Sequence, residues 1–379
     1  MKAYQLSWSK TSGWNKPFDP DNSATDQQVL LVFGGVDEVV DSARFLELKE
    51  MFPNANIVMS STAGEIIDDR LQDESIIATL LIYEKTKLKF VEFTIKDFDS
   101  CIDCGKQIQK ELLGQDLNHI LVISDGGMVN GDELVTGINK GLPSDVIVTG
   151  GLAADAGRFD KTYVGLNKTP ESGNIVAIGH YGKKLLVSHG SMGGWDEFGP
   201  IRQVTKSEGN VLMELDSQPA LSVYKQYLGE KAKELPGAAL LFPLSLYSED
   251  RQVQLVRTIL NIDEQSGSMT FAGDIPQGAE VRFMMANFDR LIDGAAQAAE
   301  AALKTPQEKP EFVLMISCIG RKIVLDQRVE EELESVKEIF GEHAIYTGFY
   351  SNGEISPFVE GVACSLHNQT MTITTYKEI

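Results

Sequence analysis

The segment NIVMSSTAGEI, residues 56–66, joins an apolar run to a short polar turn, and it decides how the rest of the chain is interpreted. Ile57, Val58 and Met59 have the character of a buried strand, and small hydroxyl residues, a glycine and a carboxylate follow directly. Residues 347–356, TGFYSNGEIS, again place Gly-Glu-Ile behind an apolar and aromatic segment. This repetition indicates a structural unit that occurs more than once.

A strand–helix–strand–hairpin unit is found three times along the chain, because each copy contains two apolar runs around a helix-period segment and then two alternating runs. The expected bounds are 29–35, 37–52, 56–59 and 75–95 in the first copy, 119–127, 132–142, 145–151 and 174–190 in the second, and 312–320, 327–340, 344–350 and 361–376 in the third. Strands rich in Val, Ile and Leu between helices predict an α/β fold of mixed sheets flanked by helices.

Two related domains are expected from this arrangement. A chain of 379 residues is long enough for two or three domains, each with its own core. A boundary after NVLMELDSQPALSVYKQYLG gives a first domain, residues 1–228, with two copies of the unit. The second domain, residues 229–379, then holds one copy and extra strands.

The composition restricts the class of protein. The net charge of −21 argues against nucleic acid as a partner and disfavours an anionic membrane surface, because both attract clustered Lys and Arg. The first 18 residues have no apolar core or cleavage site of a secretory signal, and no run reaches the length of a membrane span. Four cysteines do not make a disulfide framework. We therefore expect a cytoplasmic protein that does not insert into membranes.

Several longer motifs resemble the FIST family, whose members carry an N-terminal and a C-terminal FIST domain, and the resemblance covers nearly the whole chain in order. These motifs are GGLAADAGRFDKTYV (150–164), QVTKSEGNVLMELDSQPALSVYKQYLG (203–229), GDIPQGAEVRFM (273–284), ISCIGRKIVLDQRVEEELESV (316–336) and TGFYSNGEISP (347–357). The resemblance implies an intracellular sensory module for signal transduction. It also implies a small ligand, with amino acids proposed for the family, and a separate signalling partner: a sensor histidine kinase of a two-component system or a cyclic-di-GMP enzyme.

The turns that follow the second strands are the candidate ligand contacts, because open α/β sheets bind ligands at the carboxyl ends of their strands. In the first copy, Glu65 is suited to pair with a ligand amine, and in the second copy Arg158 is suited to hold a carboxylate. Two other interpretations stay open: the hydroxyls satisfy a turn, and Arg158 forms an ion pair within the protein. The candidates in these two copies are Ser60, Ser61, Thr62, Glu65, Asp155 and Arg158.

The third copy offers an equivalent set, in which Arg321 follows a strand end and Tyr350, Asn352 and Glu354 form the turn. Cys318 lies three residues before Arg321, and positive charge lowers the pKa of a thiol. A cysteine in an apolar run is more often a small core residue, and that interpretation is favoured here. Cys101 and Cys104 have the spacing of a redox motif, but the nearby Asp residues favour a structural interpretation.

A haem interpretation depends on His189. A group of stand-alone bacterial FIST proteins, the NosP group, binds haem and senses nitric oxide. His189 ends an apolar run and precedes several glycines and Trp195, which suggests an axial ligand beside a pocket with room and an aromatic wall. The alternative is a hydrogen-bonded structural histidine.

Three functions of different classes remain: a small-ligand sensor, a haem-based nitric oxide sensor and an enzyme acting in the strand-end clefts. The chain has no P-loop, no H-E-x-x-H motif and no Gly-x-Ser-x-Gly elbow, so no catalytic residue is assigned. A sensor is the preferred interpretation, and a ligand held between the two domains would change their packing and thereby a partner.

Overall fold

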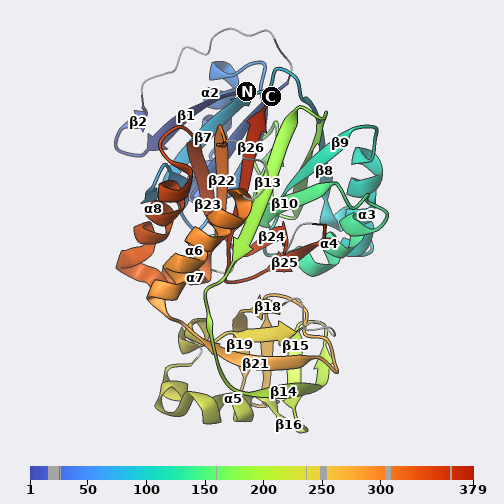
Figure 1. Ribbon diagram of the computed structural model, residues 1–379, viewed down its shortest axis with the longest axis vertical. Helices are drawn as coiled ribbons and strands as arrows, with labels where there is room; N and C mark the ends of the chain where they lie inside the picture. The colour runs from blue at the N-terminus through green and yellow to red at the C-terminus, as the bar shows by residue number, and fades with distance from the viewer. Residues whose placement is uncertain are drawn as a thin grey trace.

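A computed structural model describes residues 1–15, 25, 27–158, 160–235, 237–247, 254–303, 309–358 and 361–379. It contains three six-stranded sheets that form a main body and a fourth sheet that forms a smaller body beneath it (Figure 1). The predicted α/β class is confirmed, with mixed sheets flanked by helices. The two chain ends lie together at the top of the main body (Figure 1), where the N-terminal ammonium contacts Glu378 at 3.4 Å.

The first sheet is built around the first copy of the unit. Parallel strands β3 and β4 lie at its centre, with β7 antiparallel to β3 on the other side. Its strands, in spatial order, are β11 Val164–Leu166, β4 Asn56–Ser61, β3 Gln28–Gly34, β7 Ser75–Ile82, β1 Lys2–Ser9 and β2 Gly13–Trp14. Helices α1 Val36–Val39 and α2 Ser42–Met51 pack against its outer face.

The second sheet repeats this arrangement around parallel strands β9 and β10, with β12 antiparallel to β9. Its strands are β25 Cys364–His367, β24 Gly353–Pro357, β10 Ile147–Leu152, β9 Leu117–Ser124, β12 Asn174–Tyr181 and β8 Lys87–Thr94. Helices α3 Cys101–Leu112 and α4 Gly131–Asn139 cover its outer face, through buried apolar side chains at helical spacing.

The third sheet has β22 and β23 as its parallel pair, with β26 antiparallel to β22. Its strands are β13 Leu185–Met192, β26 Met371–Glu378, β22 Phe312–Cys318, β23 Ile345–Ser351, β5 Glu65–Ile67 and β6 Arg70–Gln72. Three helices cover it: α6 Phe288–Leu303, α7 Ile319–Leu325 and α8 Val329–Phe340. Short 3-10 helices lie at Ile95–Asp97, Gly229–Glu234, Gly237–Leu241 and Asp326–Arg328.

The three units exchange strands in a cycle. The strand that follows each second strand joins the sheet of another unit: β5 joins the third sheet, β11 the first and β24 the second. The inner faces of all three sheets then share one apolar core, which includes Phe33, Ile123 and Phe349. Because each unit supplies strands to its neighbours, equivalent strand-end turns recur in three places of the main body.

The predicted hairpins are wrong in one respect: their two strands do not pair with each other. β7 lies between β3 and β1, whereas β8 pairs with β12 in the second sheet, and β13 likewise pairs with β26. The connection after β7 is held by Glu378, whose carboxylate accepts hydrogen bonds from the backbone N–H groups of Glu84 and Lys85, each at 2.8 Å. A contact from a residue so distant in sequence cannot be inferred from an alternating pattern, which identifies a strand but not its partner.

The smaller body is an eight-stranded sheet with its own apolar core, and α5 Ala220–Leu228 packs against it. Its strands are β14 Asp196–Glu208, β15 Val211–Leu215, β16 Gln218–Pro219, β17 Leu244–Tyr247, β18 Gln254–Arg257, β19 Ile259–Asp263, β20 Ser268–Phe271 and β21 Glu280–Met285. The division of the chain after residue 228 remains a proposal, and strands from both sides of it share this sheet.

Candidate functional site

A buried carboxyl group lies at the strand end of the first unit. Oε1 of Glu65 accepts a hydrogen bond from Thr62 Oγ1 at 2.5 Å, and Oε2 accepts from Ser75 Oγ at 2.6 Å and Ser75 N at 3.3 Å. Burial raises the pKa of Glu65 to about 7, although the hydroxyl donors of Ser75 and Thr62 act in the opposite direction. This side chain therefore changes charge near neutral pH.

The third unit repeats the same arrangement around Glu354. Ser351 Oγ donates to its Oε1 at 2.7 Å, and Thr370 donates to Oε2 through Oγ1 at 2.8 Å and through N at 3.2 Å. Burial raises the pKa of Glu354 to about 8. Sequence analysis identified both glutamates but missed Ser75 and Thr370. The available signal is a hydroxyl residue at the start of the strand that runs antiparallel to the unit's first strand: Ser75 begins β7, and Thr370 directly precedes β26.

The strand ends of β3 and β4 open into a cavity of about 500 Å³, here called the first-unit pocket. Three predicted residues, Thr62, Glu65 and Arg158, meet in its wall, although Arg158 comes from the second unit. A position at the carboxyl ends of parallel strands is typical of ligand sites in α/β sheets. The pocket is lined by Gly35, Val36, Asp37, Glu38, Thr62, Gly64, Glu65, Asp73, Glu74, Ala156, Arg158 and Lys322.

The two basic side chains that line the first-unit pocket, Lys322 and Arg158, differ in whether they have an ion-pair partner among the described residues. Lys322 forms an ion pair with Asp73 and donates to the carbonyl oxygen of Ala63 at 2.7 Å, so its charge is neutralised within the protein. Arg158 is exposed, and its Nε donates to the carbonyl oxygen of Asp155 at 2.9 Å. Within the described residues no carboxylate forms an ion pair with Arg158, so its guanidinium can pair with a ligand anion.

The other candidates of the first two units shape the turns around the pocket. Ser60 Oγ donates to the carbonyl oxygen of Ser61 at 3.1 Å, and Ser61 Oγ accepts from Tyr163 N at 2.9 Å. Asp155 Oδ2 accepts from Asp160 N at 2.7 Å. The Ser61 bond joins β4 to the loop that carries Arg158, and the local bonds match the interpretation in which the hydroxyls satisfy a turn.

Arg321 and Tyr350 are directed away from solvent, toward Glu332 on α8. Arg321 is fully buried and donates to Glu332 Oε2 from Nε at 2.9 Å and from Nη2 at 2.7 Å, and Nη2 also donates to the carbonyl oxygen of Leu291 at 2.7 Å. Nη1 donates to the carbonyl oxygen of Gly193. Tyr350 OH donates to Glu332 Oε1 at 2.6 Å. The geometry of Arg321 is that of a buried structural ion pair.

His189 and Trp195 do not form the two sides of one haem pocket. Trp195 packs against α6 and donates from Nε1 to the carbonyl oxygen of Gln369 at 2.9 Å. His189 alternates with Gly190 on β13, and a Cβ on Gly190 would collide with α6, so His189 is on the opposite face of the strand. A Cβ on Gly194, where φ is +79°, would also collide with α6. The glycines permit close packing on a helix, and these residues do not fit the expected haem site.

All four cysteines are free and buried. Burial and the nearby Glu354 carboxyl raise the pKa of Cys318, and burial raises the pKa of Cys101 and that of Cys104 to about 12. Because the thiolate is the reactive form, we expect no thiol of the folded protein to react with a disulfide reagent within minutes, and all four to react in denaturant. Rapid labelling of Cys101 or Cys104 in the native protein would instead restore the redox interpretation.

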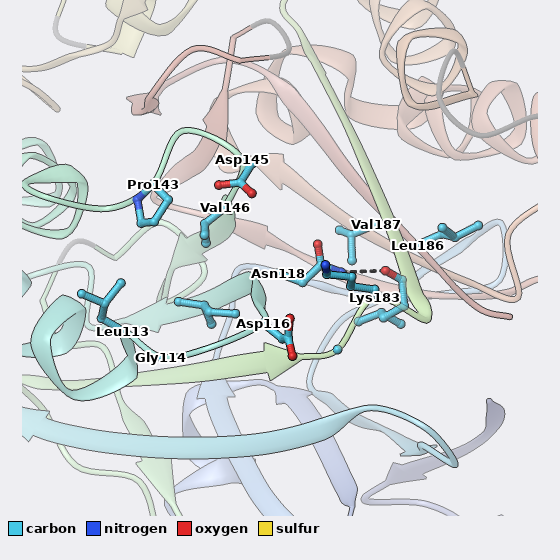
Figure 2. Close-up of a pocket in the computed structure, with 13 residues that line it drawn as sticks. Leu113, Gly114, Asp116, Asn118, Pro143, Asp145, Val146, Lys183, Leu186 and Val187 are labelled. Carbon is cyan, nitrogen blue, oxygen red and sulfur yellow. Dashed lines mark hydrogen bonds between the residues drawn. The ribbon is translucent and has the colours of Figure 1, made fainter.

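Two further cavities lie elsewhere on the main body. Asn352 lines one of about 320 Å³ against the smaller body. Figure 2 shows a larger one, of about 740 Å³, at the amino ends of β9 and β10, where Asn118 Nδ2 donates to the carbonyl oxygen of Leu185 at 2.6 Å. None of the predicted site residues lines the cavity in Figure 2. In the part of the chain that the structure describes, no group of three or more His, Cys, Asp or Glu is arranged to hold a metal ion.

The fold and site define an α/β protein in which three strand-exchanging units present polar turns at their strand ends. The model of the FIST N domain matches residues 28–218, and that of the FIST C domain matches residues 220–357. The chain therefore belongs to the FIST family, whose domains are sensory domains of signal transduction.

A curated relative carries no description of function. An uncharacterized protein, MJ1623, of Methanocaldococcus jannaschii is 24% identical over 234 residues, which cover 58% of this chain and 44% of that protein. The chain thus spans less than half the length of this relative. Among the described residues, no helix is long and apolar enough to cross a membrane.

Proposed function

We propose that this protein is a sensor that binds a small amine-bearing carboxylate, such as an amino acid, in the first-unit pocket. The observation that carries the proposal is the meeting of Glu65 and Arg158, from two different units, in the wall of one cavity. A carboxylate suits the ammonium group of such a ligand, and a guanidinium suits its carboxylate. The volume of about 500 Å³ is in the range of small-molecule sites.

The electrostatic balance of the pocket supports an ammonium group on the ligand. Asp37, Glu38 and Glu74 line the pocket together with Glu65, and Lys322 is already paired with Asp73. Glu38 has a cationic neighbour in Lys10, at 2.8 Å. Among the described lining residues, the acidic side chains outnumber the cation that is left, Arg158, so a ligand with a positive end and a negative end fits better than a simple anion.

Signal transmission is proposed to use the two FIST domains that meet at the pocket. Lys322 belongs to the matched FIST C segment, whereas the other lining residues belong to the FIST N segment. A ligand that contacts both segments changes their relative packing if it binds one arrangement better than the other. The proposed recipient of this change is a sensor histidine kinase or a cyclic-di-GMP enzyme that acts in trans.

A thermal-shift screen of amino acids and simple amines tests the proposal. A stabilising hit is expected, and its affinity should fall about tenfold or more in Arg158→Gln, because a charge-assisted pair with the ligand carboxylate is lost. Glu354→Gln is the matched control, since Glu354 is held by the same kind of hydroxyl donors but lies outside this pocket. Equal loss in both variants, or no loss in Arg158→Gln, would contradict the assignment of the pocket.

A further inference from the structure

A second cavity, of about 320 Å³, lies between the strand ends of the second unit and the smaller body, and is here called the interbody pocket. Met128 and Leu152 of the second unit form one wall. Leu260, Phe271 and Asp274 of the smaller body form another. Like the first-unit pocket, it lies where a unit's first strand ends and the next helix begins, and it takes part of its wall from another unit.

Two side-chain acceptors of the interbody pocket, Asn352 Oδ1 and the Asp274 carboxylate, are poorly supplied with donors. Oδ1 of Asn352 is buried and has no hydrogen-bond partner within the described part of the chain. Within the described part of the chain, the hydrogen bond that the Asp274 carboxylate accepts is a long one, 3.4 Å, from Asn130 Nδ2. A buried acceptor without a donor costs free energy, so both groups favour a ligand that brings N–H donors.

The apolar part of the interbody pocket is accessible from solvent. Met128 and Leu260 are 48% and 45% exposed, which is high for large apolar side chains that line a cavity. Among the described residues that line it, none is Lys or Arg. The nearby Arg257 is 2% exposed, and its Nη2 donates to both carboxylate oxygens of Asp132, at 3.1 and 3.0 Å. The charge of Arg257 is therefore neutralised by Asp132.

The two bodies are already joined next to this cavity. Arg257 of the smaller body pairs with Asp132 of α4, and Asp132 Oδ2 also accepts from Asp274 N at 2.8 Å. Arg257 Nη1 further donates to the carbonyl oxygen of Leu366 at 3.1 Å. A ligand in the interbody pocket touches the same two bodies and therefore stabilises their docked arrangement.

We propose that the interbody pocket binds a small organic cation, with a primary ammonium group between Asn352 and Asp274 and an apolar group against Met128 and Leu260. This site is separate from the first-unit pocket and does not depend on the function proposed there. The pocket recognises the hydrogen-bond donors and the positive charge of its ligand. The ligand is therefore an amine, and it need not carry a carboxylate.

Calorimetric titration with phenethylammonium chloride tests this site. Saturable binding is expected, about tenfold weaker or more in Asp274→Asn and in Asn352→Leu, since each loses an acceptor for the ammonium group. Glu50→Gln should bind as the wild type does, because Glu50 is an exposed residue of α2 that does not line this pocket. Backbone groups of Asp274 make its contacts to Asp132 and Arg257, so Asp274→Asn keeps them.

Four results would overturn this proposal. One is the absence of saturable binding by the wild-type protein. Another is unchanged affinity in both Asp274→Asn and Asn352→Leu. The third is equal affinity for 2-phenylethanol, a neutral analogue, which would show that the positive charge is not recognised. Loss of binding in Glu65→Gln but not in Asp274→Asn would assign the amine to the first-unit pocket instead.

Discussion

Replacement of Arg321 by Met is expected to lower the free energy of unfolding by about 3–5 kcal/mol, the usual effect of removing one partner of a buried ion pair. Arg321 and Glu332 are both fully buried, with the closest contact at 2.7 Å. The substitution leaves the charge of Glu332 with two hydroxyl donors, Ser317 and Tyr350, and removes the donor that the carbonyl oxygen of Leu291 now uses. Urea denaturation monitored by circular dichroism measures the change.

Two variants make this experiment specific. Arg321→Met with Glu332→Leu removes both charges and should recover part of the loss, because no uncompensated charge is left in the core. Arg158→Met is the exposed control and should change the free energy of unfolding by less than about 0.5 kcal/mol. A loss below about 1 kcal/mol for Arg321→Met would mean that the ion pair is open to water, and Arg321 would again be a candidate ligand contact.

As pH rises from 6.5 to 8, Glu354→Gln is expected to lose about 2 kcal/mol less of its free energy of unfolding than the wild type does. Burial raises the pKa of Glu354 to about 8, above the value of about 4.3 in an unfolded chain. A group whose pKa is higher in the folded protein than in the unfolded chain stabilises the fold. This stabilisation is complete at a pH below the unfolded-state pKa, and it is lost as pH rises through the folded-state pKa. Over this window the loss from Glu354 amounts to about 2 kcal/mol.

The buried histidines act in the opposite direction at the acid end of this window, so the variant is compared with the wild type at each pH. Burial lowers the pKa of His180 and of His367 to about 4, so their contribution to stability is lost as pH falls below the unfolded value of about 6.5. Glu65, with a pKa of about 7, adds a smaller loss of about 1 kcal/mol over the same window. The same change in stability in Glu354→Gln and in the wild type between pH 6.5 and 8 would show that Glu354 ionises freely in the folded protein.

The strand–helix–strand core of each unit could be predicted from the sequence, because it depends on local periodicity. Residues such as Val29–Phe33 are apolar at every position since their strand is covered on both faces. The sheet to which a following strand belongs could not be predicted. β8 pairs with β12 and β13 pairs with β26, both outside their own units, and long-range contacts such as those of Glu378 with residues 84–86 cannot be inferred from the strands themselves.

The candidate site could also be predicted only in part, because its local motifs were apparent and its long-range partners were not. The recurrence of Gly-Glu-Ile identified Glu65 and Glu354, and strand-end position suggested Arg158. The partner of Arg321 was not apparent, because Glu332 lies among other acidic residues, Glu330 and Glu331, that have the pattern of a solvent-facing helix surface. Only the fold shows that Glu332 is on the buried face of α8. Long-range partners decide which charged residues are structural and which remain available to a ligand.

Calorimetric titration of the tightest amino-acid ligand at pH 7, in two buffers of different ionisation enthalpy, tests the central claim most directly. Since Glu65 has a pKa of about 7, it is about half protonated at this pH, and an ammonium group that binds beside it should release about half a proton. The account predicts this release in the wild type, none in Glu65→Gln, and weak binding in Arg158→Gln. Equal affinity in all three proteins, with no proton released, would contradict a ligand site in the first-unit pocket.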